Sequence, residues 1–301
     1  MKVLYIAGAG RSGSTLLASV LGQSAGIADV GEIWKHWAKR AAGVAPPCGC
    51  GASLESCPFW TAVEVSRPGL FEPTPGRLAG AAHIGYARGA FKLRAQLALG
   101  RSGTEDFAAA YEQAYAAVAE VAGARVIVDS SKMPGPGMLV ERMGSVEAYV
   151  LHLTRDPRAV AASWLVRKEA EGGTQALEPR LPGEVAKAWM ARATATELLL
   201  RPGAGRGRYR TLAYERFAEE PRAVVDELLT WLGEPAGSPA FTADHEVVLS
   251  PTHSSGGNPG RLTRDEQEIR LDDRWRGTLG VQDRRRVERR TTPLRQLYGY
   301  R

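Results

Sequence analysis

The sequence is poor in cysteine and has no long hydrophobic run. Three cysteines occur in 301 residues, and an odd number argues against a disulfide framework and suits a reducing compartment. No stretch approaches the roughly 18–20 consecutive apolar residues that cross a bilayer. The apolar start of the chain is interrupted by Gly8, Gly10 and Arg11, which leaves it too short for a signal peptide. We therefore expect a cytoplasmic protein with no membrane span.

The excess of positive over negative charge is also small. The net charge is +6, and residues 261–301 hold twelve Arg and seven Asp or Glu, so most of the excess lies in this last segment. Such a segment suits an anionic ligand, but a solvated helical face has the same composition. Because the chain has no recognisable nucleic-acid-binding module and no interleaved aromatic platform, we expect no nucleic-acid partner.

What the sequence does contain is an alternation of short apolar runs with helical patterns. Residues 2–9 have the composition of a buried parallel strand, and residues 15–24 place their leucines on one helical stripe. The other predicted strands are residues 125–129, 148–154 and 208–214, and the other predicted helices are residues 31–42, 77–99, 105–122, 157–168, 184–200, 221–232 and 281–296. Strands separated by helices predict an α/β fold in which helices flank a central parallel sheet.

The chain shows no internal repeat and no linker long enough to divide it, so residues 1–301 are predicted to form a single domain. Loops rich in proline and glycine at residues 46–58 and 68–76 precede two alanine-rich helices. We expect the segment of about residues 43–122 to be a loop and helical insertion that caps the sheet.

Residues 8–15, Gly-Ala-Gly-Arg-Ser-Gly-Ser-Thr, connect the first predicted strand to the first predicted helix. Glycines allow a tight turn in which successive N–H groups point into one concavity, and the helix start adds unpaired donors and the positive end of its dipole. Ser14 and Thr15 add hydroxyls, and Arg11 adds a fixed positive charge. The loop therefore predicts a phosphate or sulfate site, although an ordinary glycine-rich turn has the same composition.

This loop differs from that of the nucleoside triphosphatases, which need Gly-x-x-x-x-Gly-Lys followed by Ser or Thr. Here Gly13 is followed by Ser14, and no strand ends in an acidic residue obviously placed to hold magnesium. Asp129 is followed directly by Ser-Ser-Lys, which are anion-binding groups. These departures disfavour ATP–magnesium hydrolysis and kinase chemistry.

A second candidate anion site follows the predicted strand over residues 148–154. Arg155 leaves that strand just before a helix that Asp156 and Pro157 begin, as N-cap and first helical residue. Ser163 lies about two helical turns further on. An arginine at the carboxyl end of a strand suits a phosphate in the crevice where open α/β sheets bind ligands, but Arg155 could equally pair with Asp156 or cap a neighbouring helix.

Together these motifs resemble the sulfotransferases that use 3′-phosphoadenosine 5′-phosphosulfate (PAPS). Residues 10–17, GRSGSTLL, look like the family's 5′-phosphosulfate loop, and residues 153–164, LTRDPRAVAASW, look like its 3′-phosphate motif. Residues 253–261, HSSGGNPGR, are similar to a loop that many bacterial members fold over the nucleotide. This likeness implies that the segment of about residues 240–301 covers the bound nucleotide. The resemblance covers most of the chain and implies a P-loop-NTPase-like three-layer fold.

The resemblance also implies which residues bind PAPS or its product PAP. By position in the motifs they are Gly10, Arg11, Ser12, Gly13, Ser14, Thr15, Arg155, Ser163, Gly257, Asn258 and Arg261. The 5′ loop carries arginine in place of the lysine of cytosolic small-molecule sulfotransferases, and their catalytic histidine has no match. The chain looks closer to the carbohydrate and tyrosylprotein sulfotransferases and their bacterial relatives, which leaves a small-molecule, carbohydrate or phenolic hydroxyl as the acceptor.

Glu32, Arg11 and Lys132 are the predicted catalytic residues. Glu32 stands where those relatives commonly have a glutamate base, and Lys132 resembles the lysine that the tyrosylprotein enzymes aim at the transferring group. In-line displacement builds charge on the sulfonate oxygens and the leaving phosphate, which Arg11 and Lys132 would stabilise. Glu32 would take the acceptor proton best if burial raised its pKa towards neutrality. A helix-start residue that interacts with the dipole is the alternative for Glu32, and His36 is the second candidate base.

Cys48, Cys50 and Cys57 lie close together in a loop rich in glycine and proline. Zinc sites usually have four protein ligands, and the fourth would have to be a distant histidine such as His36 or His83. We therefore favour a structural loop and expect no metal. The transfer needs none, because the leaving group is already a stable anion.

Two other functions stay open at this point. A P-loop kinase or nucleotide hydrolase would bind ATP–magnesium better than PAP. A catalytically silent nucleotide-binding protein would keep the fold without the chemistry, although the presence of Arg11, Glu32 and Lys132 together argues against it. The sequence specifies no oligomeric state.

Overall fold

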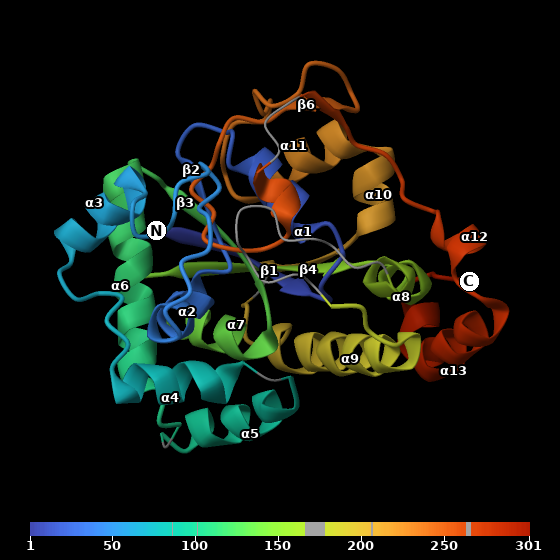
Figure 1. Cartoon of the computed structure of the whole chain (residues 1–301), viewed down its shortest axis with the longest axis horizontal. Helices are drawn as coiled ribbons and strands as arrows, with labels where there is room; N and C mark the ends of the chain where they lie inside the picture. Colours follow the sequence, from blue (N-terminus) through green and yellow to red (C-terminus); the bar gives the residue numbers. More distant parts are fainter. Residues whose placement is uncertain (86, 101, 166–177, 206, 263–265) are drawn as a thin grey trace.

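Five parallel strands form the centre of the molecule (Figure 1). The computed structural model describes residues 1–85, 87–100, 102–165, 178–205, 207–262 and 266–301. The strands are β1 Lys2–Gly8, β2 Ile27–Gly31, β3 Val126–Lys132, β4 Glu147–Thr154 and β5 Tyr209–Ala213, in the order β2-β3-β1-β4-β5. In the register of the sheet Val3 lies beside Ile127 on one side and Ala148 on the other. Because all pairings are parallel, the carboxyl ends of the strands share one edge.

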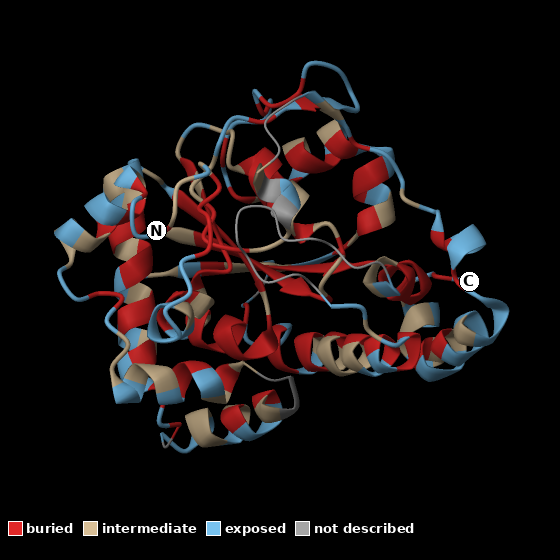
Figure 2. Cartoon of the chain, in the orientation of Figure 1, coloured by how far each residue is buried: buried red, intermediate tan, exposed pale blue. Residues whose placement is uncertain are grey.

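The side chains of β1 alternate between two hydrophobic cores, since successive residues of a strand point to opposite faces. Val3, Tyr5 and Ala7 belong to one core, and Leu4 and Ile6 belong to the other. Burial of a side chain such as Leu4 or Ile6 stabilises the fold by about 1.5–3 kcal/mol. Figure 2 shows the buried residues concentrated along the sheet and on the helix faces turned towards it.

Helices cover both faces of the sheet, which makes three layers (Figure 1). The helices on the face of Leu4 and Ile6 are α1 Ser14–Leu21, α10 Tyr214–Glu219 and α11 Pro221–Trp231. The opposite face is covered by helices that include α4 Pro75–Ile84, α6 Glu105–Ala122 and α7 Pro134–Val140. The predicted α/β fold with helices flanking a central parallel sheet is confirmed.

The connection from β2 to β3 carries the helical cap. It runs through η1 Ile33–Lys35, α2 His36–Ala41, α3 Pro58–Ser66, α4, α5 Ala87–Ala98 and α6. The single helix predicted over residues 77–99 is therefore two helices. Trp37 of α2 is fully buried against Phe107 of α6, with ring centroids 5.1 Å apart, so this tryptophan is part of the core.

The sequence analysis does not predict β2 or α7. Asp29 interrupts the apolar pattern of β2, but its buried carboxylate accepts a hydrogen bond from the Gly31 N–H at 3.0 Å. The α7 sequence contains two prolines and two glycines, which usually disfavour a helix. A Cβ on Gly137 would lie 2.9 Å from the ring of Tyr5. Glycine at this position therefore allows the helix to approach the sheet closely.

The second half of the chain contributes elements to both faces of the sheet (Figure 1). Its remaining elements are α8 Pro157–Leu165, α9 Pro182–Ala195, the π-helical turn η3 Thr196–Leu200, β6 Glu246–Val248, η4 Pro259–Leu262, β7 Glu266–Glu268, α12 Trp275–Thr278 and α13 Val281–Leu297. The helix predicted over residues 184–200 is α9 and η3, and residues 166–168 of the predicted helix 157–168 lie outside the described residues. No helix in the described part of the chain has the length and apolar character that crossing a membrane requires.

Glu141, at the end of α7, makes stability depend on pH. Burial raises the pKa of this carboxyl to about 8, against the opposing effect of Arg94 and Arg142. Its Oε1 has no hydrogen-bond partner among the described residues. Between the ordinary glutamate pKa and this raised value, the folded chain holds a proton that the unfolded chain has lost. The free energy of unfolding therefore falls as the pH rises through that interval.

We expect Glu141→Gln to remove this dependence, because the amide is neutral at every pH. Between about pH 5 and about pH 9 the wild type should lose on the order of 2–4 kcal/mol more stability than the variant. Urea unfolding at the two pH values measures the difference, with the exposed Glu219 changed to Gln as the matched control. Equal losses in the wild type and Glu141→Gln would show that this carboxyl is not responsible.

Candidate active site

The turn from β1 to α1 is held in a shape that directs N–H groups into one space. Arg11 and Gly13 have φ angles of 71° and 83°, and left-handed residues in such turns form anion-binding nests. A Cβ on Gly13 would lie 2.6 Å from the ring of Tyr214, so the position requires glycine. Gly13 is also the N-cap of α1 and has no side chain to accept from the first N–H groups. These donors can therefore serve a ligand.

Buried polar atoms without partners lie at the carboxyl ends of three strands. Within the described ranges, Ser12 Oγ after β1, Ser131 Oγ near the end of β3 and Arg155 Nε after β4 make no hydrogen bond. A buried polar group left unpaired costs about 1–3 kcal/mol. A ligand with several acceptor oxygens at this edge would pair them.

Arg155 joins the two predicted anion sites. Its Nη1 donates to the backbone carbonyl of Arg11 at 2.9 Å, and its guanidinium lies 4.2 Å from the centroid of the Tyr214 ring. Its Nη2 lies 3.2 Å from Asp272 Oδ2, so one carboxylate partly neutralises it. The two arginines therefore occupy adjacent positions on one edge of the sheet.

Asp156 does not pair with Arg155. Its carboxylate binds the Arg158 guanidinium at 2.7 Å and accepts from the Arg158 N–H at 2.8 Å, which caps α8 as the sequence predicts. Of the interpretations of Arg155, the structure therefore disfavours the pairing with Asp156.

The Arg11 side chain reaches the motif that follows β4. Its Nε donates to Ser163 Oγ at 3.2 Å, and its guanidinium lies 5.6 Å from the Trp164 ring centroid. Burial, with the charge of Arg155 nearby, lowers the pKa of Arg11. The predicted 5′ loop and 3′ motif are thus in direct contact and hold positive charge that a bound anion would stabilise.

Glu32 and Lys132 form a buried ion pair. Lys132 Nζ lies 2.6 Å from Glu32 Oε1 and donates to the carbonyl of Ser130 at 2.7 Å, while Lys35 pairs with the other carboxylate oxygen of Glu32. Burial alone would raise the pKa of Glu32, but Lys132 and Lys35 outweigh it and lower this pKa well below its ordinary value. The raised pKa that would make Glu32 most effective as a base is therefore not present here, because two lysines hold the carboxylate ionised.

Glu32 makes no capping hydrogen bond, although it directly precedes η1. Glu32 thus stands at a helix start, as the alternative interpretation requires, but its carboxylate pairs with Lys35 and Lys132 rather than with the N–H groups of the helix. The second candidate base, His36, is stacked on Phe71 with ring centroids 3.9 Å apart. Burial, with Lys39 and Arg40 nearby, lowers the pKa of His36 to about 3, so its ring is neutral.

Arg11 and Lys132 share a rare backbone conformation. In the described ranges they are the only residues other than glycine with a positive φ, at 71° and 69°. This conformation costs about 1–2 kcal/mol per residue, and such strain is concentrated at functional sites. Two of the three predicted catalytic residues thus stand out by an independent criterion.

Residues 252–258, here called the strap, pack on β2 and α1. The Ser255 N–H donates to the Val30 carbonyl at 3.1 Å, and the Asn258 N–H donates to Thr15 Oγ1 at 3.2 Å. Part of the predicted covering segment therefore does lie against the loop between β1 and α1, the predicted phosphate site.

The strap also passes close to Glu32. A Cβ on Gly256 would lie 3.6 Å from the Glu32 Cβ, and one on Gly257 would lie 3.0 Å from Thr15 Oγ1. The predicted ligand residues Gly257 and Asn258 are thus beside the loop. The side chain of Arg261, the third residue predicted in this segment, lies outside the described part of the structure.

Arg192 of α9 is a site residue that the sequence analysis does not identify. Its Nη1 lies 3.7 Å from the position of a Cβ on Gly10. Burial, with Arg180 nearby, lowers the pKa of Arg192, and burial likewise lowers that of Lys132. The site thus concentrates positive charge, which favours an anionic ligand. No motif surrounds Arg192, and only the packing of α9 brings it here.

Asp129 is turned away from the site into the core. Its Oδ2 accepts from the hydroxyls of Tyr111 and Tyr115 on α6, at 2.5 and 2.6 Å, and its Oδ1 accepts from the Ser131 N–H at 2.8 Å. It is fully buried. The carboxylate therefore anchors α6 to β3 and is not placed as a magnesium ligand.

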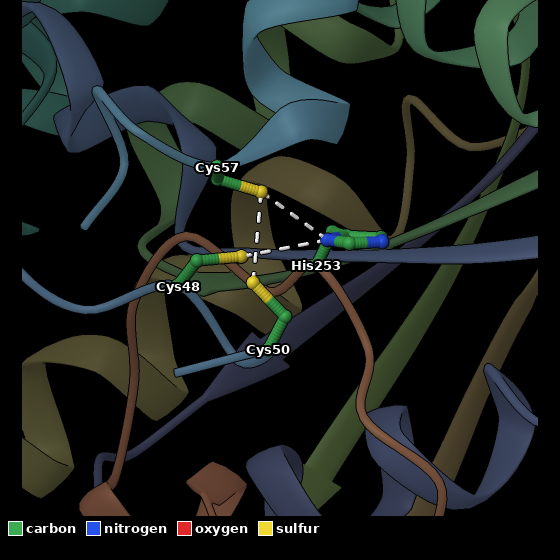
Figure 3. Close-up of side chains that lie close together, drawn as sticks. All are labelled: Cys48, Cys50, Cys57 and His253. Atoms are coloured by element: carbon green, nitrogen blue, oxygen red, sulfur yellow. Dashed lines mark hydrogen bonds between the residues drawn. The ribbon is translucent and has the colours of Figure 1, made fainter. Parts of the chain in front are cut away.

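The three cysteines lie together, and the strap adds a histidine to them (Figure 3). His253 Nδ1 lies 3.7 Å from Cys48 Sγ and 3.4 Å from Cys57 Sγ. The expectation that His36 or His83 would be the fourth residue is therefore wrong. His36 stacks on Phe71, and His83 bonds the Gln96 side chain at 2.8 Å.

A cavity of about 630 Å³ lies between α2 and α3. Its lining includes His36, Trp60 and Phe71 but none of the three predicted catalytic residues. We therefore assign it no part in the reaction.

Comparisons with known proteins agree with this geometry. The model of a family described as "Sulfotransferase family" matches residues 4–237. The sulfotransferase domain from the curacin biosynthetic pathway is similar in structure, with a TM-score of 0.52 and 16% identity over 97% of each chain. The sulfotransferase domain from the Synechococcus PCC 7002 olefin synthase has a TM-score of 0.52 and 18% identity, covering 96% of this chain and 94% of that one. None of the curated proteins compared with the chain matches it.

The two solved structures show a similar fold, and the family match spans the phosphate loop, the Glu32–Lys132 pair and the Arg155–Ser163 motif. The chain therefore belongs to the sulfotransferase family.

Proposed function

We propose that the protein transfers the sulfonate group of PAPS to an acceptor hydroxyl and releases PAP. The observation that carries the proposal is the contact between the Arg155 guanidinium and the Arg11 backbone, which brings the two predicted anion sites next to each other. PAPS has anionic groups at two separate places, the 3′-phosphate and the 5′-phosphosulfate. ATP has a single phosphate chain and would leave the position at Arg155 unused.

The 5′-phosphosulfate would bind in the loop between β1 and α1. Backbone N–H groups of residues 10–15 and the hydroxyls of Ser14 and Thr15 would hold it. The 3′-phosphate would bind at Arg155 and Ser163, where it would compete with Asp272 for the Arg155 guanidinium. Gly257 and Asn258 of the strap would cover the nucleotide.

The transfer forms a bond between the acceptor oxygen and the sulfur atom. It breaks the bond between that sulfur and the bridging oxygen of the 5′-phosphate, so PAP leaves with the bonding electron pair. The acceptor proton passes to Glu32. Arg11 and Lys132 would stabilise the negative charge on the sulfonate oxygens and on the bridging oxygen.

The Glu32–Lys132 ion pair couples the proton transfer to Glu32 with the charge stabilisation by Lys132. While Lys132 binds Glu32, it lowers the pKa of the carboxyl and makes it a weak base. When Lys132 turns to the sulfonate oxygens, Glu32 loses a cationic partner, and its pKa rises. Donor binding would therefore strengthen the base that receives the proton.

The acceptor we propose is a small-molecule, carbohydrate or phenolic hydroxyl. Its oxygen has to approach Glu32 from the side opposite to the leaving phosphate for an in-line displacement. The strap at Gly256 and the lysines that flank Glu32 border this approach.

A nucleotide comparison tests the proposed function. We expect PAP to bind at least about 10-fold more tightly than ADP, because hydrogen bonds to a charged group contribute about 1.5–3 kcal/mol. Calorimetric titrations with PAP, ADP and ADP with magnesium measure the difference. Equal or tighter binding of ADP with magnesium would favour the kinase or hydrolase and reject the proposal. A protein that binds PAP but never converts PAPS to PAP would be the catalytically silent alternative.

A further inference from the structure

Four potential metal ligands converge between the helical cap and the strap. Cys48, Cys50 and Cys57 come from the loop before α3, and His253 comes from a segment 196 residues beyond Cys57. Their Sγ and Nδ1 atoms all lie within 4.8 Å of one another (Figure 3). All four residues are described by the structure, and their side chains point towards a common centre.

Three of the six distances between the four ligand atoms match the edges of a tetrahedral site. Zinc–sulfur bonds of about 2.3 Å and zinc–nitrogen bonds of about 2.0–2.1 Å at tetrahedral angles predict about 3.8 Å between two sulfurs and about 3.6 Å between sulfur and nitrogen. Cys50 Sγ and Cys57 Sγ are 3.7 Å apart, and the two distances from sulfur to His253 Nδ1 are 3.7 and 3.4 Å. A disulfide would need a sulfur–sulfur distance of about 2.05 Å, and the three cysteines form none.

We propose that Cys48, Cys50, Cys57 and His253 bind one Zn²⁺ ion as a structural site. Three thiolates and one imidazole are soft and borderline ligands, which favour zinc over magnesium or calcium. Four protein ligands fill a tetrahedral site and leave no position for substrate, which is the arrangement of structural zinc. The ion takes no part in sulfonate transfer.

Contacts other than those among the four ligand atoms hold the ligand residues in position. The Cys48 N–H donates to the Ala52 carbonyl at 2.7 Å, and the Gly51 N–H donates to the Cys48 carbonyl at 2.8 Å, which forms a tight turn around two of the thiols. The His253 ring is stacked on Phe59, with ring centroids 4.5 Å apart and planes 8° apart. Such supporting contacts orient ligands in metal sites.

The backbone around the site ties the cysteine loop to the strap. The Trp60 Nε1–H donates to the His253 carbonyl at 2.9 Å, and the Gly49 N–H donates to the Ser254 carbonyl at 3.0 Å. A Cβ on Gly49 would lie 2.6 Å from the Thr252 carbonyl oxygen. Zinc would therefore lock the strap to the cap, a few residues before the strap reaches Thr15 at Asn258.

The first test is the metal content of the untagged, reduced, full-length protein. We expect about one zinc ion per chain by mass spectrometry of the metal, and expect Co²⁺ in its place to give the intense visible absorption and thiolate charge-transfer bands of a tetrahedral thiolate site. Less than about 0.2 zinc per chain, together with no such Co²⁺ spectrum, would overturn the proposal. This test needs no variant that could fail to fold.

The second test is the variant His253→Ala. His245→Ala is the matched control, since His245 is an exposed histidine that precedes the strap in the chain. We expect His253→Ala to weaken zinc binding at least about 10-fold in competition with a chromophoric chelator, and His245→Ala to bind as the wild type does. Wild-type zinc affinity in His253→Ala would overturn the four-ligand site.

A third measurement rests on the proposed function. Because the strap contacts Thr15, we expect His253→Ala to bind PAP about 3- to 10-fold more weakly than His245→Ala does. The zinc content is measured without nucleotide. If the protein binds zinc but not PAP, the proposed function is rejected and the zinc proposal stands. If the protein binds PAP but not zinc, the zinc proposal is rejected and the proposed function stands.

Discussion

The Glu32→Gln variant is expected to lose sulfonate transfer by at least about 100-fold, because a general base contributes about 10²- to 10⁴-fold to such reactions. It should nevertheless bind PAP at least as tightly as the wild type does. In the wild type, Glu32 holds Lys132 at 2.6 Å. An uncharged amide holds this lysine less strongly, so Lys132 becomes available to the anionic nucleotide. Initial rates with labelled PAPS and calorimetric titration with PAP measure the two effects.

Glu227→Gln is the matched control for this variant. Glu227 also pairs with a basic residue, in its case Arg216 at 2.5 Å, but it lies on α11 at the surface. We expect its transfer rate to equal that of the wild type. Thermal unfolding of Glu32→Gln shows whether the unpaired Lys132 destabilises the fold, since a buried charge without its partner is costly. Normal turnover in a folded Glu32→Gln protein would contradict the assignment of Glu32 as the base.

The Arg155→Gln variant is expected to lose the preference for a 3′-phosphate. We expect PAP affinity to fall about 10- to 100-fold, because the variant removes charge-assisted hydrogen bonds worth about 1.5–3 kcal/mol. ADP has no 3′-phosphate, so its affinity should change less than about 3-fold. Titrating the same preparation with both nucleotides separates loss of this contact from damage to the loop that Arg155 also supports through the Arg11 carbonyl.

Arg289→Gln is the control for charge, because Arg289 is exposed on α13 and the same substitution there removes the same charge. Its affinities for PAP and ADP should match those of the wild type. An equal loss of PAP and ADP binding in Arg155→Gln would mean that Arg155 only positions the β1–α1 loop. The two-position model of the nucleotide site would then be wrong.

Four of the five strands and the loop after β1 could be predicted because their information is local. The apolar run of β1, the glycines after it and the leucine stripe of α1 lie within the first 21 residues, and each follows from short-range rules of strand, turn and helix. Arg155 and Ser163 were identified in the same way, within one strand–helix unit. The contact between the two motifs follows from the adjacency of β1 and β4 in the sheet.

The parts that could not be predicted depend on contacts between distant segments. The lowered pKa of Glu32 comes from Lys132, which is 100 residues away in the sequence. Arg192 reaches the loop only through the packing of α9, and His253 reaches the cysteines only through the path of the strap. Local composition also misleads at α7, where close packing on Tyr5 outweighs the low helix propensity of proline and glycine.

The anchoring of α6 by Asp129 bears on how far the helical cap of this protein could be exchanged. The hydroxyls of Tyr111 and Tyr115 donate hydrogen bonds to Asp129, which lies three residues before Lys132 on β3. An exchange of the helical cap for that of a relative would therefore disturb the position of Lys132 unless both tyrosines were carried over. Libraries that vary the cap but keep this pair should retain turnover far more often than those that randomise it.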